Sequence, residues 1–220
     1  WQWQLSDLPV EDSFDVDVYD VDGFEVDAGT VAALHAQGLR VVCYLSAGSW
    51  EEWRPDAGQF PEAVLGKEYP GWPGERWLDI RRIDLLAPIV GARLDRCRAK
   101  GFDGVEPDNV DGYANDTGFA LTDEDQLLYN RWLAEEAHAR GLSIGLKNDE
   151  EQVLDLLLHF DWALTEDQQR LFVAKGDGDS KEQAVSTREF NEIKQALLFK
   201  FILEEIADGR VALNSDWRVV

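Results

Sequence analysis

The stretch from residue 101 to residue 113 turns abruptly from apolar to acidic, with Glu106, Asp108 and Asp111 close together. Pro107 cannot donate to a central β-ladder, so a buried strand is predicted to end there. Side chains alternate along a strand, so Glu106 and Asp108 leave on the same face. In an α/β barrel this end of the strand carries the active site. The alternative is that these acids cap the following helix or bind an ion.

Polar residues recur at the ends of the predicted strands. In chain order they are Asp20 and Asp22, Tyr44 and Ser46, Glu106 and Asp108, Lys147 and Asn148, and Glu166. If the sheet closes, these side chains meet at one mouth. Two carboxylates facing each other there suit glycoside hydrolysis, because one protonates the leaving oxygen and the other attacks or activates water. The number of acids keeps a metal-dependent hydrolase open as the alternative.

The histidines weigh against metal chemistry. His35, His138 and His159 fall in or at the ends of helix patterns and not at strand ends, so surface or packing roles are expected for them. The chain also has no Gly-rich dinucleotide fingerprint and no P-loop. We therefore expect neither a metal nor a cofactor.

Strand and helix patterns alternate, which predicts a parallel α/β sheet. Strands are predicted over residues 1–5, 16–21, 39–46, 102–108, 142–146 and 161–165, with weaker signals at 184–186 and 210–214, and helices over 28–37, 85–100, 123–140, 151–159 and 188–207. Residues 47–82 are predicted to form a long functional loop, rich in tryptophan, without obvious elements. Eight units fit a short TIM-type (β/α)₈ barrel that forms one domain over residues 1–220. An open doubly wound sheet, which needs fewer strands, is the alternative.

The charge balance of the chain is strongly acidic, with 21 basic and 44 acidic residues and a net charge of −23. Nucleic acid is therefore excluded as a partner, because phosphate binding needs basic patches. The negative electrostatic field of such a chain attracts a cationic substrate, for example an amino sugar. The alternative is that the charge only keeps the protein in solution.

Other features bear on compartment and cross-links. No apolar run reaches about 18 residues, so no transmembrane helix is expected. The chain starts at Trp1 without an initiator Met or a signal peptide, which we interpret as a trimmed mature domain. Cys43 and Cys97 have no metal-ligand spacing, and two buried free thiols are favoured over a disulfide, which stays open.

Several runs of residues resemble the endo-α-1,4-polygalactosaminidase family, glycoside hydrolase family 114. They are WQWQL at 1–5, CYLSAGSWEEWRPD at 43–56, WLDIR at 77–81, GVEPDNVDGY at 104–113, GLKND at 145–149 and DWALTE at 161–166. The resemblance covers roughly residues 1–167 and is lost after Asp167. It implies a TIM-type barrel, a secreted or cell-surface location, and endo-cleavage of α-1,4-linked galactosamine polymers.

The resemblance also implies one catalytic acid on the strand at 102–108 and another on the strand at 161–165. These positions match Asp108 as the nucleophile and Glu166 as the general acid/base, with Glu106 in reserve for the first role. To act as an acid near neutral pH, Glu166 needs a raised pKa.

The expected substrate-binding set is drawn from the same strand ends and the loops beside them. Its members are Asp20, Asp22, Tyr44, Ser46, Trp50, Glu106, Asn109, Tyr113, Lys147 and Asn148. Asp20 and Asp22 are expected to bind a substrate ammonium, and Lys147 or Asn148 to keep Asp108 ionised. Loop packing is an equal alternative for Trp50, while Trp3 and Trp132 are assigned to the core.

The expected partner is a cationic, galactosamine-containing polysaccharide, bound by a monomer. Two other hypotheses stay open. The chain is either a barrel that binds carbohydrate without turnover, or a scaffold that carries the motifs without function.

Overall fold

The computed structural model describes residues 1–164. Glu166 and the elements predicted after it lie outside the described residues, so the single domain over residues 1–220 stays a prediction.

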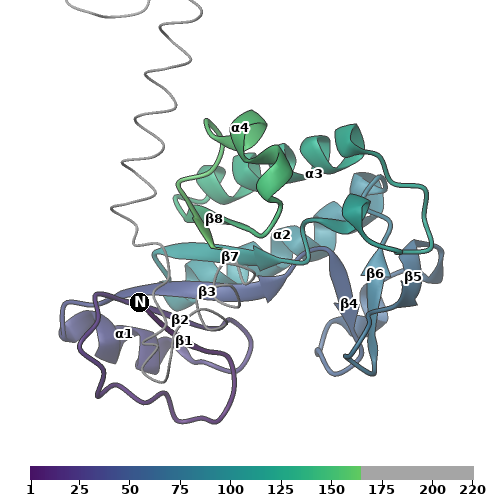
Figure 1. Cartoon of the computed structure of the whole chain (residues 1–220). Helices are drawn as coiled ribbons and strands as arrows, with labels where there is room; N and C mark the ends of the chain where they lie inside the picture. Colours follow the sequence, from purple (N-terminus) through teal and green to yellow (C-terminus); the bar gives the residue numbers. More distant parts are fainter. Residues whose placement is uncertain (165–220) are drawn as a thin grey trace, which may run out of the picture. The chain divides into compact units, whose positions relative to one another are not determined.

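The main sheet is parallel and six-stranded. Its strands are β1 (Gln2–Gln4), β2 (Val18–Asp22), β3 (Arg40–Ser46), β7 (Gly104–Asp108), β8 (Ser143–Lys147) and β9 (Trp162–Leu164). They lie side by side in the order β1-β2-β3-β7-β8-β9 (Figure 1). Each new strand joins the same growing edge, which is how a barrel sheet is built, whereas a doubly wound sheet reverses its order at a switch point. The TIM-type prediction is confirmed, and the doubly wound alternative does not fit the described strands.

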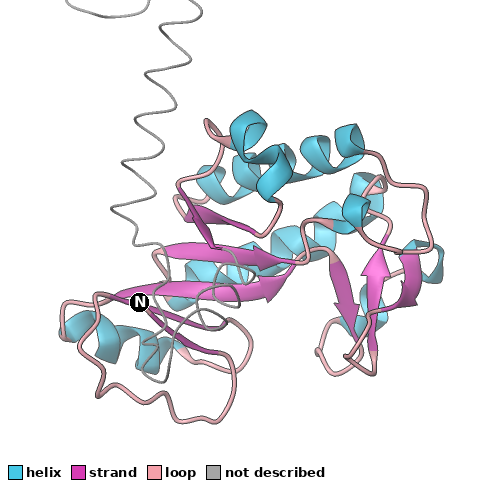
Figure 2. Cartoon of the chain, viewed as in Figure 1, coloured by secondary structure: helices cyan, strands magenta, loops and turns pink. Residues whose placement is uncertain are grey.

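The helices between these strands begin and end close to the predicted bounds. They are α1 (Ala28–Ala36), α2 (Ile83–Lys100), α3 (Asp123–Ala139) and the short α4 (Val153–Leu156) (Figure 2). Thr122 caps α3 in a capping box with Asp125, which satisfies free backbone donors at the helix start. Gly101 ends α2 at a φ of 93°, which favours a residue without a Cβ. The helix predicted over 151–159 is shorter than expected, because Glu150–Gln152 forms a 3₁₀ turn before it and the helix already ends at Leu156.

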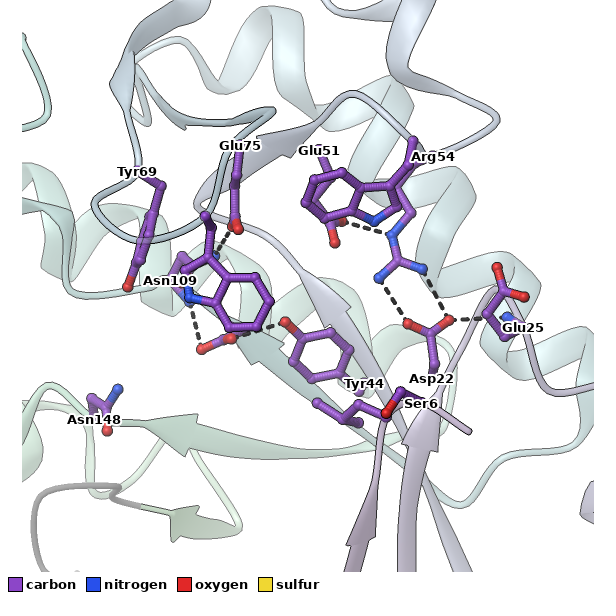
Figure 3. A pocket seen from close by; sticks show the side chains of 14 residues that line it. Ser6, Asp22, Glu25, Tyr44, Glu51, Arg54, Tyr69, Glu75, Asn109 and Asn148 are labelled. Carbon is purple, nitrogen blue, oxygen red and sulfur yellow. Dashed lines mark hydrogen bonds and ion pairs between the residues drawn. The ribbon is translucent and has the colours of Figure 1, made fainter. Parts of the chain in front are cut away.

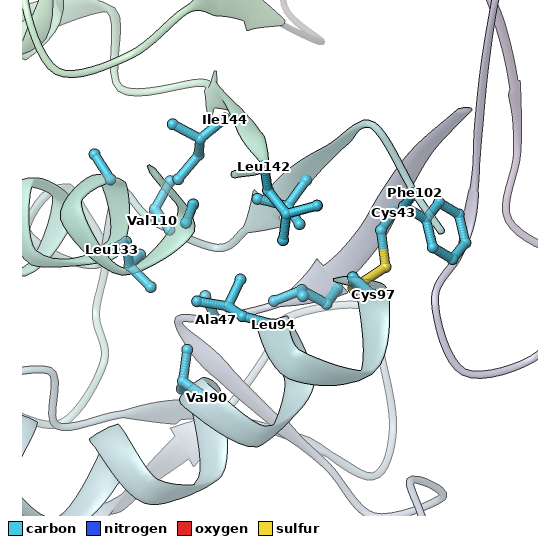
Figure 4. Close-up of a cluster of buried hydrophobic side chains, with 14 of the residues drawn as sticks. Cys43, Ala47, Val90, Leu94, Cys97, Phe102, Val110, Leu133, Leu142 and Ile144 are labelled. Carbon is cyan, nitrogen blue, oxygen red and sulfur yellow. A yellow bond between two sulfur atoms is a disulfide. The ribbon is translucent and has the colours of Figure 1, made fainter. Parts of the chain in front are cut away.

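The described core lies between the strands and the helices. Figure 4 shows Val90 and Leu94 of α2, Leu133 of α3 and Ile144 of β8 gathered in one cluster of buried side chains. These are the apolar faces that the helix and strand periodicities predict.

Cys43 of β3 and Cys97 of α2 form a disulfide, with their Cα atoms 6.0 Å apart. The preference for two free thiols is therefore wrong. Both residues were correctly placed on buried faces, but the crossing of α2 over β3 decides that the two positions meet. Spacing along the chain carries no such information.

Removing the disulfide is expected to destabilise the fold. Because it closes a loop of 54 residues, the double variant Cys43→Ala/Cys97→Ala should lose about 4 kcal/mol of unfolding free energy relative to the oxidised wild type. Urea unfolding with and without dithiothreitol measures this. Unfolding of the wild type should become easier in reductant, and that of the double variant should not change. Equal stability of the two oxidised proteins would contradict the prediction.

Residues 47–82 are not the element-free loop that the sequence predicts. They contain a three-stranded antiparallel sheet with the strand order β4 (Ser49–Glu51), β6 (Glu75–Leu78), β5 (Leu65–Glu68), and two 3₁₀ turns, Ala57–Gln59 and Glu62–Val64. Strands of three or four residues show too little alternation to be recognised from sequence. Figure 1 shows this small sheet beyond the ends of β3 and β7.

A buried arginine of α2 ties this inserted segment to the barrel. Arg93 donates from Nε and Nη2 to Asp56, at 2.8 and 2.9 Å, and from Nη1 to the carbonyl of Ser46 at 2.7 Å. The bidentate pairing fixes the orientation of the insertion as well as its position. The small sheet is thus held firmly enough to present side chains to the ends of the barrel strands.

Within residues 1–164, no helix combines the length and the apolar character needed to cross a bilayer.

Candidate active site

A cavity of about 430 Å³ opens where the carboxyl ends of β2, β3, β7 and β8 meet the inserted sheet. It is lined by Leu5, Ser6, Asp22, Glu25, Tyr44, Glu51, Trp53, Arg54, Tyr69, Trp72, Glu75, Asp108, Asn109 and Asn148. Figure 3 shows these side chains converging from the ends of the barrel strands and from the inserted segment. The volume lies in the range of small-molecule sites.

Asp108 stands at the end of β7 with its carboxylate held on both sides. Oδ2 accepts a hydrogen bond from the Tyr44 hydroxyl at 2.9 Å, and Oδ1 accepts one from the backbone N–H of Asn109 at 2.9 Å. The Lys147 ammonium lies 3.5 Å from Oδ1. The side chain keeps 19% of its surface exposed, so it can still reach a ligand in the cavity. Two donors and a nearby cation hold the carboxylate in a fixed orientation, as a nucleophile or base requires.

Asn109 follows in the left-handed conformation, with φ at 63°. Its side-chain amide donates to Ser46 Oγ at 3.0 Å, Ser49 Oγ at 2.8 Å and Glu75 Oε1 at 2.9 Å. The Ser49 hydroxyl also donates to Glu75. This buried network links the end of β7 to the inserted sheet, so the insertion helps to orient the backbone that carries Asp108.

Glu75 is a cavity residue that sequence reasoning missed. Burial raises the pKa of its carboxyl, and the charges of Glu51 and Asp108 add to that effect, while the hydrogen bonds from Ser49 and Asn109 oppose it. It lies on β6, inside the segment predicted to have no elements. No local pattern marks it, because only the fold of the insertion brings it beside Asp108.

Asp22 lines the cavity, but its carboxylate is already engaged. Arg54 donates to its two oxygens at 3.0 and 2.7 Å, and the backbone N–H groups of Phe24 and Glu25 donate to Oδ1. A bidentate guanidinium neutralises the charge that a substrate ammonium would need. The expectation that Asp22 binds the ammonium is therefore corrected.

Four of the predicted binding residues lie beneath the cavity and not on its wall. Asp20, Ser46, Glu106 and Lys147 are at most 1% exposed. A fully buried side chain cannot touch a bound sugar, so the structure corrects the expectation of direct contact for these four. The sequence places them correctly at strand ends, but it does not tell which layer of the sheet interior each one occupies.

The aromatic residues of the cavity also differ from those predicted. Trp53 and Trp72 line it and are 50% and 61% exposed. Trp50 donates from its indole N–H to the carbonyl of Ala57 and packs against the core, which is the packing alternative. Tyr113 also lies outside the cavity wall. Trp3 is only half-buried, and the Lys147 ammonium lies 4.0 Å from its ring centroid.

The cavity wall carries a strong negative charge. Five acids line it, namely Asp22, Glu25, Glu51, Glu75 and Asp108, against one base, Arg54, which gives a formal charge of −4. Arg54 is itself committed to Asp22 and Glu51. Such a wall concentrates cationic ligands and repels anionic ones.

Two histidines pair with carboxylates away from the cavity. His35 contacts Asp103 and His138 contacts Asp161, each at 2.9 Å. Among residues 1–164, no three His, Cys, Asp or Glu side chains gather in a way that suits a metal ion.

The model of glycoside hydrolase family GH114 matches residues 1–194 of the chain. The chain belongs to this family. The family resemblance predicted from the sequence motifs is confirmed, and a GH114 protein is a glycosidase. Together with the cavity at the strand ends, this assigns the barrel to glycoside hydrolysis.

Two solved structures resemble this chain. The crystal structure of Aspergillus fumigatus Ega3 in complex with galactosamine is 38% identical, covers 87% of this chain and 83% of its own, and superposes with a TM-score of 0.73. The glycoside hydrolase domain of PelA from Pseudomonas aeruginosa, at 16% identity and a TM-score of 0.59, covers 75% of this chain and 66% of its own and shares the fold.

An uncharacterized protein of Deinococcus radiodurans is 39% identical over 112 residues, which is 49% of this chain. The match spans only about a third of that relative, 34% of its length.

Asp149 follows the cavity residue Asn148, and both adopt positive φ, at 54° and 52°. Asn130 donates to Asp149 Oδ2 at 2.9 Å, while Oδ1 is buried without a donor among the described residues. Burial raises the pKa of the Asp149 carboxyl from its ordinary 3.8 to about 7. The folded state therefore favours the protonated form, and its stabilising contribution, complete below about pH 4, is lost as the pH rises through 7.

Asp149→Asn should therefore stabilise the protein in a pH-dependent way. The neutral amide removes the cost of ionising a buried group, so the gain should be about 1–2 kcal/mol at pH 8, after allowance for solvent screening, and close to zero at pH 4. Chemical unfolding at both pH values measures it, with the exposed Asp155→Asn as the matched control. An equal gain at pH 4 and pH 8 would show that ionisation is not the cause.

Proposed function

We propose that this protein is an endo-acting glycosidase that cleaves α-1,4-linked galactosamine polymers, with Asp108 as nucleophile and Glu166 as general acid/base. The observation that carries the proposal is Asp108 itself, held by Tyr44, Asn109 and Lys147 at the edge of a strongly acidic cavity. The 38% identity to a protein crystallised with galactosamine supports the substrate class. The role of Glu166, outside the described residues, rests on the family resemblance.

In the proposed reaction, an Asp108 oxygen attacks the anomeric carbon while Glu166 donates its proton to the leaving glycosidic oxygen. This forms a glycosyl ester on Asp108 and releases the part of the polysaccharide that carries the leaving oxygen. A water molecule then attacks the anomeric carbon and gives its proton to Glu166, and the ester bond to Asp108 breaks. Both acids return to their starting forms, and the configuration of the sugar is retained.

The cavity wall supplies the binding features that an amino sugar needs. The excess of acids over bases on the wall gives a negative field for ammonium groups, and Trp53 and Trp72 offer flat apolar surfaces at the rim. The disulfide fits a secreted or cell-surface location, because such bonds persist in oxidising compartments.

Trp72→Ala should raise KM for galactosamine oligomers about 5–10-fold and change kcat little, because stacking at the rim stabilises bound substrate and transition state alike. Steady-state kinetics on oligomers long enough to span the cavity measure this, and Trp72→Phe, which keeps a ring, should recover most of the loss. A fall in kcat at constant KM would assign Trp72 a different role.

The direct test is product release by the full chain from three oligomer series: α-1,4-linked galactosamine, its N-acetylated form, and neutral α-1,4-linked galactose. We expect internal cleavage of the cationic series, with short oligomers as the first products. A folded protein that cleaves none of them would refute the enzymatic proposal. If it still bound the cationic oligomers, a carbohydrate-binding role would replace it.

A further inference from the structure

Two acids and a lysine form a buried cluster directly beneath Asp108. Asp20 of β2 and Glu106 of β7 have no exposed surface, and Lys147 of β8 is 1% exposed. None of them lines the cavity. Three ionisable groups buried this deeply are costly unless their charges and hydrogen bonds are satisfied within the cluster.

Lys147 is placed between two carboxylates. Its ammonium contacts Glu106 Oε1 at 2.8 Å and lies 3.5 Å from Asp108 Oδ1. The ring of Trp3 on β1 covers it at 4.0 Å. The position of this cation therefore depends on how much negative charge Glu106 and its neighbours carry.

The remaining oxygens of the two buried acids have no hydrogen-bond donor within residues 1–164. They are both oxygens of Asp20 and Oε2 of Glu106. An ionised carboxylate can only accept hydrogen bonds, so two ionised acids here would leave three buried acceptors unsatisfied. A single proton between the two carboxyls turns one of these oxygens into a donor to another, so that one acceptor instead of three is left unsatisfied, and it removes one of the two charges.

The electrostatics of the cluster agree with this geometry. Burial raises the pKa of Asp20 well above its usual range, and the charge of Glu106 raises it further. The charged and titratable groups that face the two acids are Lys147 on β8, Asp108 on β7 and Tyr44 on β3. With one shared proton, the two acids carry −1 and Lys147 carries +1.

We propose that Asp20 and Glu106 share one proton and act as positioning residues, which keep the Lys147 ammonium in place against Asp108. The buried cluster of Asp20, Glu106 and Lys147 is then neutral overall, so that it adds no net charge to the acids that line the cavity. This inference rests on the proposed role of Asp108 and gives a function to two acids that cannot touch the substrate.

The test is the acid side of the kcat/KM profile against pH, where protonation of the nucleophile stops turnover. Lys147→Met should move this limb up by about one pH unit, because an opposite charge nearby is lost. The double variant Asp20→Asn/Glu106→Gln should move it down by about one unit, because the Lys147 charge is no longer neutralised. Asp20→Asn alone should move it by less than about 0.3 unit, because Glu106 still carries the single charge.

Two outcomes would overturn the proposal. A shift in Asp20→Asn as large as in the double variant would mean that Asp20 carries a charge of its own. Unchanged limbs in all three variants would mean that the cluster has only a packing role, since packing alone changes rate or stability without moving the limb.

A second measurement does not depend on turnover. In wild-type protein labelled with ¹³C at Asp and Glu carboxyls, one carboxyl should keep the chemical shift of the protonated form at pH 8, and that signal should disappear in Asp20→Asn. The absence of any protonated carboxyl at pH 8 would refute the shared proton. Because this result is independent of catalysis, it separates failure of the cluster from failure of the glycosidase proposal.

Discussion

Asp108→Asn is expected to lower kcat/KM on α-1,4-linked galactosamine oligomers by about 10⁴-fold, with the fold intact. The amide has nearly the same shape as the carboxylate: its oxygen can still accept the hydrogen bond from the Asn109 N–H, and its NH2 group can donate to the oxygen of the Tyr44 hydroxyl. It cannot attack the anomeric carbon. The measurement is product release at high enzyme concentration, with circular dichroism to show that the variant is folded.

The matched control is Asp116→Asn, the same chemical change at an exposed acid paired with Lys67, and it should retain wild-type activity. Glu166→Gln should lose activity to a similar degree with natural oligomers. It should lose less with substrates whose leaving group needs no protonation, because the acid step is then bypassed. If Asp108→Asn kept more than a tenth of the activity, Asp108 would not be the nucleophile. Glu106, the reserve candidate for that role, could not attack the sugar directly in its place, because its side chain is fully buried.

Gly48→Ala is expected to destabilise the protein by about 3 kcal/mol or more and to abolish activity with it. A Cβ at this position would lie 1.6 Å from the backbone oxygen of Asn109. The N–H groups of Ala47 and Gly48 both donate to the carbonyl of Asp108, at 3.0 and 3.1 Å. Any relief of the clash therefore moves the end of β7 and the nucleophile.

The control for this variant is Gly58→Ala in the first 3₁₀ turn, where an added Cβ meets nothing within 4 Å. It should be neutral or slightly stabilising, because alanine reduces the freedom of the unfolded chain. Thermal unfolding of both variants, followed by activity below the transition, gives the comparison. A Gly48→Ala protein with wild-type stability would show that the turn and β7 separate more easily than their hydrogen bonds suggest.

The contact of Gly48 with the end of β7 also explains how the inserted sheet takes part in the site. Leu78 of β6 donates to the carbonyl of Gly48, and Asn109 donates to Ser49 and Glu75. The insertion thus contributes both cavity residues and the support of the Asp108 backbone. Because it is inserted between β3 and α2, it reaches the strand ends without disturbing the parallel order of the sheet.

The sequence by itself determined the features of the structure that depend on residues close together in the chain. Apolar runs and helix periodicity located six strands and four helices, and Thr122 and Gly101 marked helix ends because capping is a property of neighbouring residues. The position of Asp108 at a strand end followed from the change to acidic residues around Pro107. The motifs also identified the GH114 family, since they are contiguous in the chain.

Only the tertiary structure decided which of these residues meet, and at what depth. Asp20 and Asp22 share a strand face, yet Asp20 is fully buried beneath the cavity and Asp22 is bound by Arg54. The place of Glu75 in the site depends on its contact with Asn109, 34 positions away, and the disulfide joins cysteines 54 positions apart. The physical reason is that burial and pairing are set by the crossing of whole elements, whereas periodicity fixes only the direction in which a side chain leaves its own element.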